Sequence, residues 1–195
     1  MNKFSLSLCM FGLAIMGLAF TSPVGTTVDV EKSSITWVGK KVTGKHNGTI
    51  KLKDASLVME EGMLKGGTFI IDMTTITNDD MDGNMKGKLE GHLKSADFFN
   101  VEEFPTATVE LTNVVSRGTA GSYKVIGDLT IKGITKPVKF NAQIGEEDGM
   151  KMATANVVVD RSEYDVRYGS GSFFDNLGDK TIYDEFELNV KLVLK

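Results

Sequence analysis

The sequence predicts an all-β fold: a closed antiparallel barrel of about eight strands, with one short helix near a barrel end. Two observations carry this prediction. Several segments alternate apolar and polar residues with a period of two, which is typical of strands with one face buried and one face in water. The chain also contains 21 glycines but only 3 prolines, a composition that favours short strands joined by glycine turns over a helical bundle.

The length of 195 residues and the hydrophobic content of 41% predict one ordinary domain with one core. A two-sheet sandwich is the alternative architecture. Closure is favoured because about eight strands suffice to close an antiparallel sheet around one small ligand. A closed sheet also leaves no long strand exposed at an edge.

The N-terminal segment, residues 1–22, is expected to be a secretory signal peptide, and the barrel domain is expected to occupy residues 27–195. Lys3 gives a positive start, and residues 4–20 are uncharged and apolar. This run is shorter than the ~20 residues that span a bilayer comfortably, so cleavage is favoured over an anchor. We therefore expect a periplasmic or secreted protein with no integral membrane segment in the mature chain. Cys9, the only cysteine, would be removed together with the signal peptide.

The first two strands of the barrel are expected on either side of a glycine-rich turn. Ile35 and Trp37 share one face of the first strand. The turn is predicted at residues 44–48, after which Ile50 and Leu52 point to the interior from the second strand.

The following strand shows strong alternation, because Phe69, Ile71 and Met73 share one face. Residues 84–93 then change to a helical pattern, the only convincing one after the leader. Five more strands are predicted, with a hairpin tip at residues 146–149 between the third and the fourth of them; they cover residues 106–111, 124–131, 138–144, 153–159 and 186–194.

An aromatic block follows the predicted helix and is expected to form a lid or end wall of the barrel. It runs from residue 91 to 105 and contains Phe98, Phe99 and Phe104. These rings are equally suited to plugging a barrel end and to lining a pocket for an acyl or prenyl chain, since neither role needs a polar partner.

Three blocks of the sequence, residues 91–99, 104–107 and 127–138, resemble the signature blocks of the YceI-like family of bacterial exported proteins. The resemblance extends from about residue 28 to residue 195. It implies a lipocalin-like antiparallel barrel whose apolar interior accommodates a long isoprenoid or similar lipid, typically in the periplasm. A shared fold hosts many ligands, so the site has to be argued residue by residue.

The predicted apolar pocket consists of side chains that point inward by strand alternation or belong to the aromatic block. Each of them is equally compatible with an ordinary filled core. They are Trp37, Phe69, Ile71, Met73, Phe98, Phe99, Phe104, Val109, Leu129 and Phe140.

The head-group candidates are His92, Arg161, Tyr164 and Arg167. His92 lies at the end of the predicted helix, where a structural, capping histidine is the alternative to a contact with a quinone oxygen or pyrophosphate. The arginines have the forked donors that suit phosphate. Nearby carboxylates in residues 160–165 favour a salt-bridged surface loop instead.

Composition and motifs argue against several other functions. The net charge of −4 does not indicate the positively charged surface that binds nucleic acid. A metal site is not expected, because His46 is the only other histidine and no compact ligand set accompanies it, and no cofactor is predicted. No nucleophile motif is present, so a binding protein is favoured over an enzyme.

The leading hypothesis is thus a protein that holds a long-chain amphiphile: a polyisoprenoid, an isoprenoid quinone or a fatty-acyl lipid. The alternatives are an enzyme that uses the same cavity and a partner-binding barrel with a filled core. Both a monomer and a homodimer are compatible with the sequence.

Overall fold

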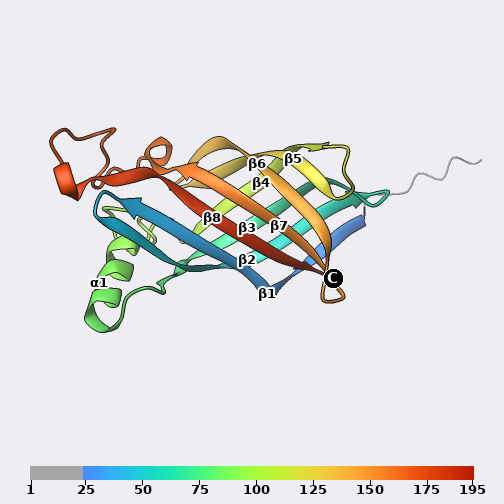
Figure 1. Cartoon of the computed structure of the whole chain (residues 1–195), viewed down its shortest axis with the longest axis horizontal. Helices are drawn as coiled ribbons and strands as arrows, with labels where there is room; N and C mark the ends of the chain where they lie inside the picture. The colour runs from blue at the N-terminus through green and yellow to red at the C-terminus, as the bar shows by residue number, and fades with distance from the viewer. Residues whose placement is uncertain (1–23) are drawn as a thin grey trace, which may run out of the picture.

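The computed structural model describes residues 24–195, which form a closed barrel of eight antiparallel strands (Figure 1). Each strand pairs with the next one in the chain, and the last strand returns to pair with the first. The strands are β1 (Val24–Lys41), β2 (Gly44–Glu60), β3 (Met63–Asn78), β4 (Thr106–Ser116), β5 (Ser122–Ile131), β6 (Ile134–Glu147), β7 (Met150–Asp160) and β8 (Ile182–Leu194). The predicted fold class is therefore confirmed. The predicted signal peptide lies outside the described residues.

Tight turns connect several of these strands. The β2–β3, β5–β6 and β6–β7 connections have two residues each, and in all three the second residue is glycine. Both residues of each turn adopt positive φ, for example 51° at Lys132 and 73° at Gly133. This geometry matches the right-handed twist of paired strands, and glycine adopts it without strain. The hairpin tip predicted at residues 146–149 is confirmed by the turn at Asp148 and Gly149.

The one α-helix in residues 24–195, α1 (Gly83–Lys94), lies at one end of the barrel, as predicted (Figure 1). The segment between β7 and β8, residues 161–181, lies at the same end and contains two short 3₁₀ helices, η1 (Arg161–Tyr164) and η2 (Gly178–Lys180). We call this end of the barrel the α1 end and this segment the end segment. The C-terminus lies at the opposite end.

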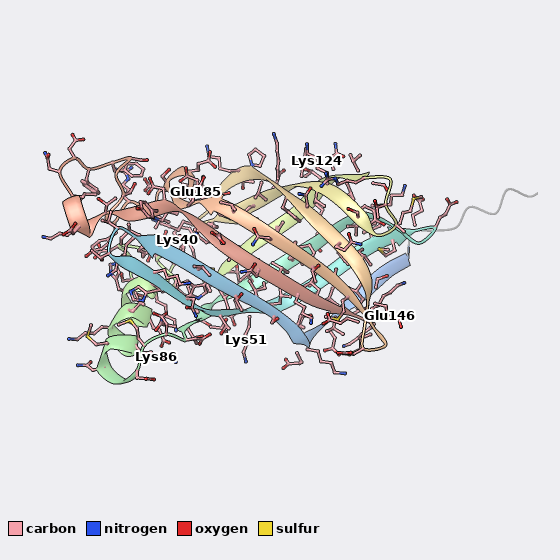
Figure 2. All side chains as sticks on the ribbon, viewed as in Figure 1. Lys40, Lys51, Lys86, Lys124, Glu146 and Glu185 are labelled. Carbon is pink, nitrogen blue, oxygen red and sulfur yellow. The ribbon has the colours of Figure 1, made fainter. Side chains whose placement is uncertain are left out.

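The interior follows the alternation seen in the sequence. In β5 every second residue is buried, from Tyr123 to Ile131, while Lys124 and Asp128 are exposed. Charged side chains such as Lys51 and Lys124 point outward into solvent (Figure 2). The barrel therefore has one apolar interior and a polar outer face.

The glycine-rich turn predicted at residues 44–48 is wrong, because these residues begin β2 and the chain turns at Val42 and Thr43. Gly48 instead allows β2 and β3 to approach each other closely at this position. A Cβ atom at this position would lie 1.8 Å from the carbonyl oxygen of Thr77 on β3. Glycine is required here by the neighbouring strand and not by a turn.

His46 accordingly lies on a strand and joins a polar cluster between β2, β3 and α1. Its Nδ1 atom lies 2.8 Å from Oδ2 of Asp80. The other carboxylate oxygen of Asp80 accepts hydrogen bonds from the backbone N–H of Asn47 and the side chain of Asn78. Glu90 of α1 accepts a hydrogen bond from the backbone N–H of Asn78, which ties the helix to the barrel.

Candidate functional site

The barrel encloses a cavity of about 210 Å³ to which all eight strands contribute. Its lining is apolar apart from Thr154, Arg161 and Tyr183. Inward-facing residues near the middle of the strands, such as Leu52 and Val109, remain only half-buried because they face this cavity. The interior is therefore partly hollow, and the part that is empty suits a hydrocarbon chain.

Nine of the ten predicted pocket residues line this cavity. They are Trp37, Phe69, Ile71, Met73, Phe98, Phe99, Val109, Leu129 and Phe140. Their contact with a ligand stays a prediction, but their placement around one hollow space is what such contact requires.

Phe104 is the exception, because it is absent from the lining of the cavity. The chain reverses after Phe99 through Asn100, whose φ is 49°, and the backbone N–H of Phe104 donates to the carbonyl of Asn100. This tight turn carries the Phe104 ring to the β5–β6 turn, where it lies 3.3 Å from the Cβ position of Gly133. The ring therefore packs on a turn and not in the pocket.

The sequence reasoning also missed a set of lining residues. The most prominent are on β8, whose Phe186, Leu188, Val190 and Leu192 all point into the cavity. The signal was available, since these residues alternate with polar ones with the same period that identified the other strands. Two alanines on β4 and β7, Ala107 and Ala155, leave room beside them.

Two aromatic rings of the block that was expected to form a lid or end wall line the cavity at the α1 end. Phe98 and Phe99 follow the helix, with their ring centroids 4.9 Å apart and their planes at 75°. The Phe99 ring also meets Phe186 of β8 edge-on. The backbone N–H of Phe99 donates to the carbonyl of Leu93, so the end of α1 fixes the position of these rings.

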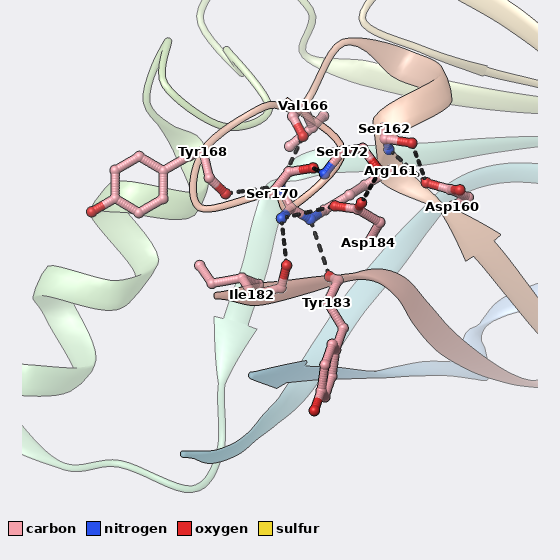
Figure 3. Close-up of polar contacts among 10 residues, drawn as sticks. All are labelled: Asp160, Arg161, Ser162, Val166, Tyr168, Ser170, Ser172, Ile182, Tyr183 and Asp184. Atoms are coloured by element: carbon pink, nitrogen blue, oxygen red, sulfur yellow. Dashed lines mark hydrogen bonds and ion pairs between the residues drawn. The ribbon is translucent and has the colours of Figure 1, made fainter. Parts of the chain in front are cut away.

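Arg161 lies at this end of the cavity and is only 2% exposed (Figure 3). Its guanidinium donates four hydrogen bonds to backbone carbonyls. The acceptors are Val166 and Tyr168 of the end segment and Ile182 and Tyr183 of β8. Nη2 also lies 3.2 Å from Oδ1 of Asp184, and the Arg161 guanidinium lies over the Phe98 ring.

Arg161 therefore holds the fold of the end segment and is not the surface ion pair that the sequence indicated. Burial lowers the pKa of its guanidinium, while the carboxylates of Asp184 and Asp160 oppose this shift. Asp160 uses its side chain to cap η1 through Ser162. Its donors are directed at fixed protein acceptors, but Arg161 also lines the cavity, and its contact with a head group stays a prediction.

The other two candidates in the end segment lie away from the cavity lining. Tyr164 is 1% exposed, and burial, followed by the charges of Glu163 and Asp160, raises its pKa to about 12. It is a neutral core residue. Arg167 is exposed, forms an ion pair with Asp165 and lies over the ring of Phe173.

His92 is also absent from the cavity lining, but it packs beside Phe98, which lines the cavity. Its ring packs edge-on against Phe98 and Tyr168, with centroid distances of 5.6 and 4.3 Å. Its Nε2 atom is buried and has no hydrogen-bond partner in the described chain. A buried imidazole nitrogen without a partner costs free energy, and a ligand oxygen at this point would supply the missing hydrogen bond.

Residues 24–195 contain no group of three or more potential metal ligands and no helix that is long and apolar enough to span a membrane.

The closed eight-stranded sheet and its apolar cavity define the class of single-chain antiparallel barrels that enclose an internal cavity. Within this class, comparison of the sequence with models of protein families gives a specific match: the model of the YceI-like domain family matches residues 27–194. The chain belongs to this family.

Individual relatives agree with this assignment. A UPF0312 protein of Pseudomonas aeruginosa is 43% identical over 75 residues, which cover 38% of each chain, so the match spans well under half of the relative's length. The crystal structure of Burkholderia cenocepacia BcnA has a TM-score of 0.70 at 22% identity and covers 86% of this chain and 99% of its own. A polyisoprenoid binding domain from Saccharophagus degradans has a TM-score of 0.61 at 12% identity, with coverages of 89% and 99%. At these identities the structural likeness shows the fold alone.

Proposed function

We propose that the mature domain is a periplasmic or secreted binding protein that holds one long-chain amphiphile, with the tail in the barrel cavity and the head at the α1 end near His92. The ligand is a polyisoprenoid, an isoprenoid quinone or a fatty-acyl lipid. The observation that carries this proposal is the hollow, apolar interior. Burial of each CH₂ group there contributes roughly 0.8 kcal/mol, so a long chain binds without any polar contact along its length.

The family supports the same ligand class. One structural neighbour is described as a polyisoprenoid binding domain, from Saccharophagus degradans. The apolar leader at residues 4–20 supports export, and N-terminal sequencing of protein recovered from the periplasm would locate the cleavage site.

The first experiment is mass spectrometry of an organic extract. The domain would be exported in a bacterial host, purified, extracted and compared with an unrelated exported barrel. We expect a stoichiometric isoprenoid or fatty-acyl species. An empty extract, together with no shift in melting temperature when quinones or prenyl lipids are added, would contradict the proposal and favour a filled core or an enzyme.

Trp37 offers a second readout, because it is the only tryptophan in the chain and lines the cavity. Its indole N–H is fixed by a hydrogen bond to the carbonyl of Thr77, 3.0 Å away. Its fluorescence should therefore change when a lipid tail fills the cavity of the delipidated domain. Titrations that follow this signal would give the stoichiometry and the affinity.

The position of the head group is tested by His92→Phe. Phenylalanine keeps the ring packing against Phe98 and Tyr168 but removes the buried nitrogen. We expect unchanged or higher stability and about tenfold weaker ligand binding, the equivalent of one hydrogen bond of about 1.4 kcal/mol. Equal affinity in the variant would place the head elsewhere. Lys124→Met, on the outer face of β5, is the control.

A further inference from the structure

We propose that the outer wall of the barrel carries a second binding site, in a hollow between β6 and β7, for a small organic cation: a primary amine with a short apolar body. This site is independent of the proposed function, because the hollow lies on the outer face of the sheet and its ligand differs in chemistry from a lipid tail.

β6 and β7 are paired over only part of their length. Their register begins beside the β6–β7 turn and ends at the pair of Asn141 and Asn156. Beyond this pair, residues 134–140 pair only with β5, and residues 157–160 pair only with β8. The two strands therefore part toward the α1 end, and a hollow of about 320 Å³ lies at the opening.

Pro137 lies where this pairing is lost. The tight turns at both ends of β6 make Ile134 and Glu147 the first paired residues of their ladders. Backbone groups of successive residues in an antiparallel ladder point alternately to the two neighbouring strands, so the odd-numbered residues of β6 face β7. Proline has no N–H to donate at such a position and is tolerated in a strand that lacks a neighbour on that side. The opening between the strands therefore has a cause in the sequence.

Tyr164 of η1 contributes a buried polar group to the wall of the hollow. Its side chain is 1% exposed and packs in the apolar core, and no hydrogen bond joins its hydroxyl to any residue from 24 to 195. Because the core encloses the rest of the ring, the hollow is the side from which a partner can reach the hydroxyl. A buried hydroxyl without a partner costs free energy, and a ligand N–H that donates to its oxygen would supply the missing hydrogen bond.

The charged residues that line the hollow are three carboxylates, Asp160, Glu163 and Glu185, and one lysine, Lys139. Asp160 uses Oδ1 to cap η1 through Ser162, which leaves Oδ2 for a ligand. Glu163 and Glu185 are exposed and form no ion pair with a described residue. The lining is therefore negative, and it favours a cation over an anion.

Four further cations near the hollow are directed elsewhere and do not cancel this charge. They are Arg161, which pairs with Asp184; Lys40, which pairs with Glu187; Lys132, which donates to the carbonyl of Asp165; and Lys136, which points to the opposite face of β6 from Lys139 by strand alternation.

Apolar side chains form the rest of the lining. Val158 is 46% exposed on the outer face of β7, and the exposed ring of Pro137 lies on β6 across the opening. A ligand that covers these groups needs a hydrocarbon part, whereas the carboxylates and Tyr164 need an N–H donor with positive charge. An alkylammonium ion combines the two in one small molecule.

The test compares three ligands of one shape and different charge. The domain would be titrated by calorimetry at about pH 7 with cyclohexylamine, cyclohexanol and cyclohexanecarboxylate. We expect the amine, which is protonated at this pH, to bind at least about tenfold more tightly than either of the others. In the ¹⁵N NMR spectrum, the amide signals that shift with the amine should belong to residues around the hollow, such as Val158 and Glu163.

Two variants test the groups that make the site. Tyr164→Phe removes only the hydroxyl, and it should weaken amine binding at least about fivefold without lowering the melting temperature, because no protein group loses a partner. Glu163→Gln removes one negative charge and should also weaken the binding. Glu110→Gln makes the same change in charge at an exposed position of β4, and this control should bind the amine as the wild type does.

The outcomes separate this site from the proposed lipid binding. Equal affinity for the amine and the carboxylate, no detectable binding of the amine, or shifts confined to residues that line the cavity would overturn the inference and leave lipid binding untouched. A lower melting temperature of Tyr164→Phe with unchanged amine affinity would assign the hydroxyl a structural role and contradict the site as well. Amine binding at the hollow in a domain whose organic extract is empty would support the inference and contradict the proposed function alone.

Discussion

At the residue scale, Arg161 is the side chain on which the α1 end depends most. It connects the end segment to the start of β8 and lies over Phe98. Removing one partner from a buried, hydrogen-bonded charge typically costs several kcal/mol, because the remaining groups stay buried without partners. A lysine cannot replace the planar fork that reaches several carbonyls at once.

The first prediction concerns this residue. Arg161→Met should lower the free energy of unfolding by about 3–5 kcal/mol, measured by urea denaturation, because four carbonyl groups lose their donor and Asp184 loses its ion-pair partner. Arg167→Met is the matched control, since Arg167 is an arginine of the same segment whose ion pair with Asp165 and contact with the Phe173 ring are both exposed, and its loss should cost less than about 1 kcal/mol. Equal effects of the two substitutions would refute the role assigned to Arg161.

A second prediction at this scale concerns Asp80 and pH. Partial burial raises its pKa, but hydrogen bonds from the backbone of Asn47 and from His46 and Asn78 outweigh this effect, so that the pKa lies below its ordinary value of 3.8. A carboxyl group with a lowered folded-state pKa stabilises the protein above its unfolded-state pKa, and this stabilisation is lost as the pH falls through the folded-state value.

The difference in unfolding free energy between the wild type and Asp80→Asn should therefore have its largest value at pH 6. It should decrease progressively below about pH 4. Urea denaturation at a series of pH values measures it. Asp79→Asn is the control, because Asp79 has no side-chain hydrogen bond or ion pair with any described residue, and its difference should stay small throughout. A pH-independent difference for Asp80→Asn would contradict the assigned contacts.

These residues show what sequence reasoning misses at the site. The presence of Arg161 in a segment rich in carboxylates predicted surface ion pairs, yet its main partners are carbonyl oxygens of the backbone. Backbone acceptors are present at every residue and leave no pattern in the sequence. The prediction for His92 rests on a local feature, its place at the end of a helix next to an aromatic block, and its contact with a ligand stays a prediction.

At the element scale, the strands were predictable because alternation with a period of two is a local property of each segment. The turn predicted at residues 44–48 failed for a non-local reason. Position 48 requires glycine because the carbonyl oxygen of Thr77, 29 residues further along the chain, leaves no room for a Cβ atom. No residue near Gly48 in the sequence indicates this contact. A glycine in a sequence thus marks either a turn or a close approach of two strands, and only the partner strand decides between them.

The third prediction tests this close approach. Gly48→Ala would place a Cβ atom 1.8 Å from the Thr77 oxygen, so β2 and β3 must separate. We expect a loss of about 3 kcal/mol or more in unfolding free energy, at or beyond the upper range for overpacked sites. Gly145→Ala in β6 is the control, since nothing lies within 4 Å of its Cβ position. A stable Gly48→Ala domain would show that the strands are not held at this distance.

At the scale of the whole molecule, the cavity exists because the closed barrel cannot be filled by the side chains that its strands supply. Small residues face one another across neighbouring strands, as in the pair of Ala142 on β6 and Ala155 on β7. The number of strands predicted closure, but the sequence left open whether the interior was hollow or filled. That depends on how side chains from all eight strands meet, which no single segment encodes.

The last prediction tests whether the hollow interior is the place where the ligand binds. Ala155 lines the cavity, so Ala155→Phe would fill part of the space that the proposed tail occupies. Filling an existing cavity adds apolar contacts without displacing neighbours, and the unfolding free energy should fall by no more than about 1 kcal/mol. The amount of lipid extracted and the response of Trp37 should both drop by more than half. Asn156→Phe, one residue along β7 on the outer face, is the control and should retain lipid. A folded Ala155→Phe domain that carries a full complement of lipid would place the ligand outside the barrel, whereas loss in this variant alone would locate it inside.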